Sequence, residues 1–216
     1  MDNNKNYLKQ VYSENNIPLI AVPTTSGTGS ESTRYAVIYY NGEKQSVTHE
    51  SIIPSYAILE SSVLKTLPLY QKKCTLLDAL CQGIESWWSV NSTDESKDYS
   101  RKAVKLIMSH IQGYITNNDD DNKQIMLASN LSGRAINITQ TTAAHAMSYK
   151  LTSLYKLPHG HAVAICLPKV WKYMNGHSDK CIDHRGASYL SDTFQDIAHC
   201  LGADNVSEAI DIFEGI

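Results

Sequence analysis

The spacing of hydrophobic and polar positions changes near Pro68. Before this proline, short apolar runs alternate with turn residues, and they read I-P-L-I-A-V at 17–22, Y-A-V-I-Y-Y at 35–40 and Y-A-I-L at 56–59. The second run ends at Asn41-Gly42, a dipeptide that is typical of a tight β-hairpin. These runs predict short strands separated by loops, as in part of an α/β or mixed sheet.

After Pro68 the apolar positions recur at the spacing of a helix. The first such pattern is carried by Leu76, Leu77, Leu80, Ile84 and Trp87. Similar patterns predict further helices over 96–115, 123–137, 142–154, 159–174, 189–201 and from 206 to the end. The acidic stretch N-N-D-D-D-N at 117–122 is expected to be a solvated loop between two helices rather than a metal site.

The sequence therefore predicts two parts, a β-rich piece over residues 1–62 and an all-helical domain over residues 63–216. The polar start and the uncapped final helix suggest a fragment of a longer fold. We find no internal repeat and no long low-complexity tract.

Composition is that of an ordinary globular chain. Of the 216 residues, 42% are hydrophobic and 19% are charged, and the formal net charge is -3. This balance gives no reason to expect nucleic acid or an acidic membrane surface as a partner. No apolar run approaches the roughly 20 residues of a membrane span, and no signal peptide is evident. The five cysteines form no C-x-x-C pair, which favours reduced thiols and a cytoplasmic location.

A loop of small residues follows the first apolar run. It reads T-T-S-G-T-G-S-E at 24–31, and its glycines, hydroxyls and backbone N–H groups could hold phosphate oxygens. The sequence matches neither of the two generic phosphate-binding loops, G-x-x-x-x-G-K-[ST] and G-x-G-x-x-G. Taken alone, a loop of this composition is more often just a connecting loop.

Three polar residues share one face of the first predicted helix. Asp78, Gln82 and Glu85 stand at positions i, i+4 and i+7. A solvated helix face is the simplest interpretation. Leucine, isoleucine and the Trp87-Trp88 pair surround these residues, however, and a carboxylate in apolar surroundings needs a partner, which a metal ion could be.

Two histidines lie in similarly apolar, small-residue surroundings. His145 falls within T-T-A-A-H-A-M, and His159 follows Pro158 at the start of a helical pattern. A lone histidine on an apolar face is usually a core residue with a satisfied ring. Two histidines and an aspartate together would suit Zn²⁺ or Fe²⁺ with a position left open for a substrate oxygen. From the residues alone, both interpretations stay open.

The order and spacing of these motifs resemble the iron-containing (group III) alcohol dehydrogenases. The resemblance is carried by P-T-T-S-G-T-G-S-E, then D-A-L-x-x-x-I-E, then H-A-M with P-H-G after it, His159 coming fourteen residues after His145. It runs from about Ile17 to about Met174. It implies an α/β remnant of a dinucleotide-binding domain followed by an all-helical metal-binding domain, with the active site between them.

The resemblance also implies roles for residues. Asp78, His145 and His159 match three of the family's metal ligands, for Fe²⁺ or else Zn²⁺. The loop with Thr24, Thr25, Gly27 and Thr28 would line NAD or NADP, and Lys44 would touch it too. The resemblance further implies that the substrate is a small alcohol or aldehyde. It also implies a homo-oligomer.

The chain departs from the family's pattern in three places. Gln82 stands where the second metal ligand is usually a histidine, so the metal would be held by a weaker, neutral amide oxygen or by three side chains. Tyr149 replaces a histidine that lies near the cofactor or substrate. The family's Gly-rich pyrophosphate loop, G-G-G-S, is not in this sequence, so we expect poor binding of NAD(P). The carboxyl end also looks shorter than the family's.

A narrower resemblance points to the branch that reduces phosphonoacetaldehyde to 2-hydroxyethylphosphonate. It rests on D-A-L-C-Q-G-I-E-S-W-W-S-V together with H-A-M-S-Y-K-L-T-S-L-Y-K-L-P-H-G-H. Arg34, Arg134 and Lys150 would suit a phosphonate, because cations pair with its oxygens. Tyr149 and Lys150 are the residues expected to act on the substrate. Alternatively, the three cations lie on the surface and have no such role.

Two functions from different classes remain at this point. The first is a metal-dependent, NAD(P)-linked alcohol dehydrogenase or aldehyde reductase. The second is a non-catalytic protein that keeps the helical fold but has lost the metal ligand at Gln82 and the Gly-rich loop. A bound divalent metal would favour the first. The exact substrate and the choice between NAD and NADP cannot be predicted from this sequence.

Overall fold

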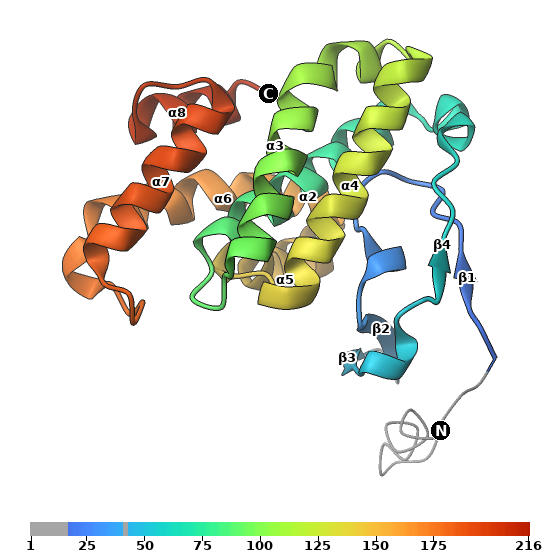
Figure 1. Ribbon diagram of the computed structural model, residues 1–216, viewed down its shortest axis with the longest axis horizontal. Helices are drawn as coiled ribbons and strands as arrows, with labels where there is room; N and C mark the ends of the chain where they lie inside the picture. Colours follow the sequence, from blue (N-terminus) through green and yellow to red (C-terminus); the bar gives the residue numbers. More distant parts are fainter. Residues whose placement is uncertain (1–16, 41–42) are drawn as a thin grey trace.

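The computed structural model describes residues 17–40 and 43–216. Its strands and small-residue loops gather at one end of the long axis, and the last two helices lie at the opposite end (Figure 1). A layer of packed helices fills the space between them. The β-rich part and the helical part thus follow one another in space as they do along the chain.

The strands form two small sheets. Strand β1, Ile20–Ala21, pairs in parallel with β4, Tyr56–Ala57. Strand β2, Tyr35–Tyr40, pairs antiparallel with β3, Glu43–Thr48. The register from Tyr35↔Thr48 to Tyr40↔Glu43 is that of the predicted hairpin. Its Asn41-Gly42 turn lies outside the described residues.

In the described part of the chain, seven α-helices follow the strands. They are α2 (Leu69–Trp88), α3 (Asp94–Ile115), α4 (Asp119–Thr139), α5 (Ala143–Tyr155), α6 (His159–Gly176), α7 (Ala187–Leu201) and α8 (Val206–Glu214). Helix α2 is the centre of the core, and α3, α4, α6 and α7 pack against it. From Leu76 onward most of its apolar residues are almost fully buried, and both Trp87 and Trp88 are core residues, as the sequence predicts.

The acidic stretch at 117–122 differs from the sequence-based prediction, because four of its six residues are helical. Helix α4 begins at Asp119. The side chain of Asn118 accepts hydrogen bonds from the backbone N–H groups of Asp120 (3.0 Å) and Asp121 (3.1 Å). Carboxylates are favourable in the first turn of a helix, where the helix dipole is positive. A run of acidic residues was thus mistaken for a loop when it is a helix start.

Two glycines let the small-residue loop lie directly on α4. Gly29 has φ +58°, and a Cβ on Gly133 would come within 2.3 Å of the Gly29 carbonyl oxygen. Only glycine fits such a crossing of two backbones. The contact fixes where Thr28 and Ser30 stand relative to the helical domain.

The described residues, 17–40 and 43–216, include no helix that is both long and apolar enough to cross a membrane. All five cysteines are free thiols.

Candidate metal centre and cleft

Asp78 and Gln82 lie one turn apart on α2, in the interior of the protein. Their exposed fractions are 3% and 4%. Asp78 Oδ1 and Gln82 Oε1 are buried and make no hydrogen bond. Burying such oxygens without a partner costs free energy, and most native proteins avoid it. A bound ligand such as a metal ion would supply the partner that these two oxygens lack.

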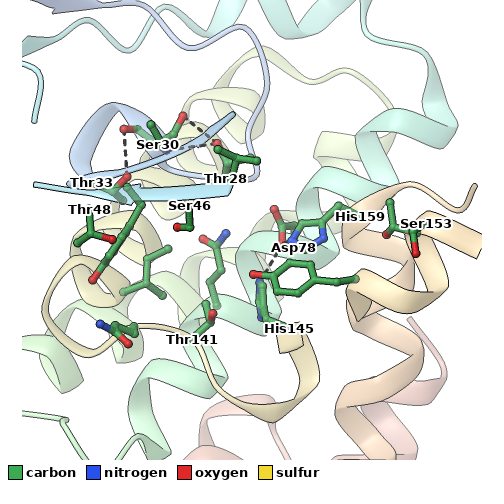
Figure 2. A pocket seen from close by; sticks show the side chains of 18 of the residues that line it. Thr28, Ser30, Thr33, Ser46, Thr48, Asp78, Thr141, His145, Ser153 and His159 are labelled. Carbon is green, nitrogen blue, oxygen red and sulfur yellow. Dashed lines mark hydrogen bonds and ion pairs between the residues drawn. The ribbon is translucent and has the colours of Figure 1, made fainter. Parts of the chain in front are cut away.

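Two histidines complete this site from other helices. His145 is on α5 and His159 is the first residue of α6, and Figure 2 shows both rings beside Asp78. His145 Nε2 lies 3.3 Å from Asp78 Oδ1, and His159 Nε2 lies 3.8 Å from the same oxygen. One ligand atom from each residue falls within 4.8 Å of the others. This is the one group of its kind among the described residues.

The donor atoms fit a divalent metal. They comprise one carboxylate oxygen, two imidazole nitrogens and one amide oxygen, a set that suits Fe²⁺ or Zn²⁺. His145 Nε2 also makes no hydrogen bond although it is buried. Asp78 and His145 thus each bring a buried atom without a hydrogen bond to the cluster, and Gln82, one turn after Asp78, lines the same cleft. A cation would satisfy such atoms.

Glu85 lies on α2 one turn beyond Gln82 and contacts the side of the His145 ring opposite to Asp78. Its side chain is fully buried, and one oxygen contacts His145 Nδ1 in a short ion pair. Burial alone would lower the pKa of His145, but the Glu85 and Asp78 carboxylates outweigh it and raise that pKa to about 9. Burial likewise opposes ionisation of Glu85, yet His145 and Thr142 lower the pKa of this carboxyl. Without a metal, the cluster is a buried ion pair.

Gly160 allows His159 to approach α2. A Cβ at this position would lie 1.9 Å from the Cys74 carbonyl oxygen and 2.9 Å from Asp78 Cβ. The start of α6 can therefore pass close to α2 only because residue 160 has no side chain. The P-H-G motif thus contributes both a candidate ligand and the close contact that positions it.

The cluster forms one wall of a large open cleft with a volume of about 1330 Å³. The opposite wall carries the hydroxyls of Thr28, Ser30 and Thr48 (Figure 2). A cleft of this size has room for a dinucleotide end together with a small substrate. The β-rich part and the helical part meet there.

The structure places the residues of the predicted cofactor loop differently from one another. Thr28 lines the cleft, whereas Thr24, Thr25 and Gly27 are not among the residues that line it. Gly27 packs on α2, where a Cβ would come within 2.8 Å of Thr75 Cβ. The side chain of Lys44, on β3, lies outside the described residues.

The two residues expected to act on the substrate, Tyr149 and Lys150, both line the cleft from α5. The Tyr149 ring stacks on His159, with 5.9 Å between ring centroids and an interplanar angle of 10°. Burial raises the pKa of the Tyr149 hydroxyl, and the nearby Glu85 and Asp78 carboxylates add to this effect. The phenol is therefore protonated at neutral pH.

The other two predicted cations do not line the cleft. Arg34 pairs with Glu50 at 2.5 Å. Arg134 donates to Asn130 Oδ1 at 3.1 Å and lies over the Tyr99 ring. Both guanidinium groups therefore have partners elsewhere, and Lys150 is the member of the predicted trio that faces the cleft.

Sequence reasoning missed several residues of the site. It placed Glu85 on the face of Asp78 but gave it no role, because its partner is 60 residues away. It also did not single out Lys156, Gln140 and Thr141, which line the cleft near the ends of helices. A lysine six residues after Lys150 was a signal that could have found Lys156.

Comparison with known proteins agrees with this arrangement. Residues 73–214 match the C-terminal model of the Fe-containing alcohol dehydrogenase family, and residues 2–61 match the model of iron-containing alcohol dehydrogenase. Phosphonoacetaldehyde reductase of Streptomyces viridochromogenes is 34% identical over 199 residues, which are 90% of this chain and 50% of that protein.

Solved structures show the same likeness. An iron-containing alcohol dehydrogenase from Thermococcus thioreducens superimposes with a TM-score of 0.83 at 27% identity, covering 92% of this chain and 50% of the other. Sulfoacetaldehyde reductase from Bifidobacterium kashiwanohense, solved in complex with NAD⁺, gives a TM-score of 0.81 at 27% identity, covering 92% of this chain and 51% of the other. This chain spans about half the length of these relatives. It belongs to the iron-containing alcohol dehydrogenase family.

Proposed function

We propose that the protein acts as a metal-dependent, NAD(P)-linked alcohol dehydrogenase or aldehyde reductase. The observation that carries this proposal is the convergence of ligand atoms from Asp78, His145 and His159, of which the buried Asp78 and His145 atoms make no hydrogen bond. Asp78, His145, His159 and Gln82 would hold the metal. The proposal extends to the domain division near residue 62, because the cleft lies between the two parts.

In this proposal the bound groups supply electrophilic and hydride chemistry. A divalent metal polarises a carbonyl oxygen as a Lewis acid, and NAD(P)H supplies the hydride. The chain's own residues bind and orient the reactants. Tyr149, neutral and stacked on His159, can donate a proton into the cleft. The Thr28 loop borders the cleft where a dinucleotide would pass, with Thr24, Thr25, Gly27 and Lys44 as the further cofactor residues we propose.

We propose a small aldehyde with an anionic head group as the substrate, and phosphonoacetaldehyde is our first choice. Lys150 and Lys156 both line the cleft from the same end of α5. Ammonium groups pair with phosphonate oxygens. By their names, two of the relatives act on phosphonoacetaldehyde and sulfoacetaldehyde, which share a tetrahedral anionic group. Arg34 and Arg134 are not part of this proposal.

The first test is metal content. The wild-type protein, purified without oxygen from iron-supplemented cells, should contain about one equivalent of iron or zinc. The His159→Ala variant should contain none. His184→Ala is a matched control, because the side chain of His184 is 77% exposed. Gln82→His should strengthen zinc binding, because imidazole is a better ligand than an amide oxygen. Absence of metal from the wild-type protein would instead favour the non-catalytic alternative.

The second test concerns the head group. 2-Hydroxyethylphosphonate can be titrated into zinc-loaded protein and followed by ³¹P NMR. Lys150→Ala should weaken its binding about tenfold or more, since a hydrogen bond to a charged group contributes roughly 1.5–3 kcal/mol. Lys172→Ala, an exposed residue on α6 that does not line the cleft, is the control. Equal binding by wild type and Lys150→Ala would contradict the phosphonate proposal while leaving the metal centre intact.

A further inference from the structure

Glu85 is a carboxylate in a place where charge is costly. Its exposed fraction is 0%, and its helix, α2, is buried on most sides by the hydrophobic core. An ionised carboxylate there has to be compensated by donors at both oxygens. The two oxygens of Glu85 meet this need in different ways.

One oxygen, Oε1, closes the start of α5. It accepts hydrogen bonds from Thr142 N (3.0 Å), Thr142 Oγ1 (2.6 Å) and Ala144 N (3.1 Å). The N-cap residue, Thr142, makes no side-chain capping bond of its own. The first N–H groups of a helix need acceptors, and a carboxylate also complements the helix dipole. Glu85 therefore acts as the cap of a helix that begins 58 positions further along the chain.

The other oxygen, Oε2, faces His145 Nδ1. A carboxylate only accepts hydrogen bonds, so Nδ1 has to carry the hydrogen. In a neutral ring this leaves the lone pair on Nε2, the buried atom that lies beside Asp78 and makes no hydrogen bond. Metal-binding histidines commonly have their second nitrogen held by a carboxylate in this manner.

We infer that Glu85 is a positioning residue of the proposed metal centre, which selects the His145 tautomer with Nε2 free to bind a metal and pins the start of α5 to α2. This inference rests on the proposed function. Because α5 also carries Tyr149 and Lys150, the same carboxylate sets the place of the residues that face the substrate. Glu85 itself does not line the cleft and touches no substrate.

Glu85→Gln separates the two roles of the residue. Three donors, from Thr142 and Ala144, require an acceptor at the Oε1 position, so the glutamine oxygen stays there and its NH₂ group faces His145 Nδ1. Nδ1 must then accept, which moves the ring hydrogen to Nε2 and blocks the metal-binding atom. The helix cap is kept while the tautomer is reversed.

The test measures zinc affinity by competition with a chromophoric chelator. We expect Glu85→Gln to bind zinc on the order of 10–100-fold more weakly than wild type. The circular dichroism spectrum of the metal-free variant should keep its helix content, although the variant should melt at a lower temperature at neutral pH because its ion pair with His145 is lost. Glu95→Gln, on the exposed side of α3, is the matched control and should bind as wild type. Unchanged zinc affinity in Glu85→Gln would overturn the inference and leave the metal centre standing.

A measurement on the wild type does not depend on how the variant folds. Long-range ¹H–¹⁵N spectra of the zinc-loaded protein should show the His145 ring protonated at Nδ1 and without hydrogen at Nε2, with His145→Asn providing the assignment. The opposite tautomer would refute the role of Glu85. Wild-type protein that binds no zinc at all would overturn the proposed function, and this inference with it.

Discussion

His145 shows how far a side chain's chemistry depends on distant neighbours. Its side chain is only 4% exposed, and both carboxylates that face it come from α2. In the metal-free protein they favour the charged imidazolium. A metal at Nε2 would take the place of that proton, so proton and metal compete for one atom.

This competition gives the metal-free protein a defined pH dependence. The pKa of His145 in the folded state, about 9, lies above its ordinary value of 6.5. Protonation therefore stabilises the fold fully below about pH 6.5, and this stabilisation is lost as the pH rises through about 9. We expect the free energy of unfolding to fall by up to about 3 kcal/mol across this window. Urea unfolding in the presence of a chelator measures it.

The variant His145→Asn should lack this decrease, whereas His184→Asn, whose ring is exposed, should keep it. A wild-type protein equally stable at pH 6.5 and pH 9.5 would show that the folded state does not hold this proton.

At the residue scale, motifs with a fixed spacing along the chain predicted which candidate metal ligands lie together. Asp78, His145 and His159 were predicted together, and the structure brings them together. It could not give Glu85 its role, because the contact joins residues far apart in sequence. Nor could it distinguish Thr28, which faces the cleft, from Thr24 and Thr25, since the direction of each side chain in an irregular loop depends on the helices beneath it.

At the element scale, the approach of α6 to α2 decides whether the ligands can meet. The sequence predicted both helices from their apolar periodicity, and its errors were confined to their ends. Helix ends depend on caps such as Asn118 at the start of α4, which are local and easily mistaken for loop residues. The distance between two helices, in contrast, depends on single small residues at their crossing point.

Gly160→Ala should therefore weaken zinc binding strongly. The added methyl group would force α6 away from the Cys74 carbonyl, and His159 would move with it. We also expect a destabilisation of about 1–3 kcal/mol from overpacking. Gly176→Ala, at the other end of the same helix with nothing within 4 Å, is the matched control and should bind zinc normally. Zinc affinity and thermal unfolding of both variants provide the measurement.

A normal zinc affinity in Gly160→Ala would mean that the helices separate easily and that the close contact does not position His159.

At the scale of the whole molecule, the two walls of the cleft differ in how many of the expected binding residues they carry. The helical wall holds every side chain that the proposed metal centre needs. The β-rich wall offers the Thr28 loop and the hairpin β2–β3, but the sequence contains no G-G-G-S pyrophosphate loop. Metal binding and dinucleotide binding should therefore be separable in this chain.

We expect this chain to bind zinc tightly but NADH only weakly, with no saturation of NADH fluorescence below millimolar concentrations. The reason is that the adenosine and pyrophosphate half of a dinucleotide contributes much of its binding through a Gly-rich loop at a helix N-terminus. Micromolar affinity for NADH would show that the Thr28 loop alone binds the cofactor.

The small parallel pair β1–β4 has a consequence for how the protein behaves at high concentration. In the described part of the chain these strands pair only with each other. The side chains of Ile20 and Tyr56, and of Ile58 directly after β4, are more than half exposed. Parallel sheets are normally covered on both faces, and bare strand edges recruit further strands. Such a surface can pair with the strands of other polypeptide chains. At high protein concentration we therefore expect self-association through β1 and β4, with the helical core still folded.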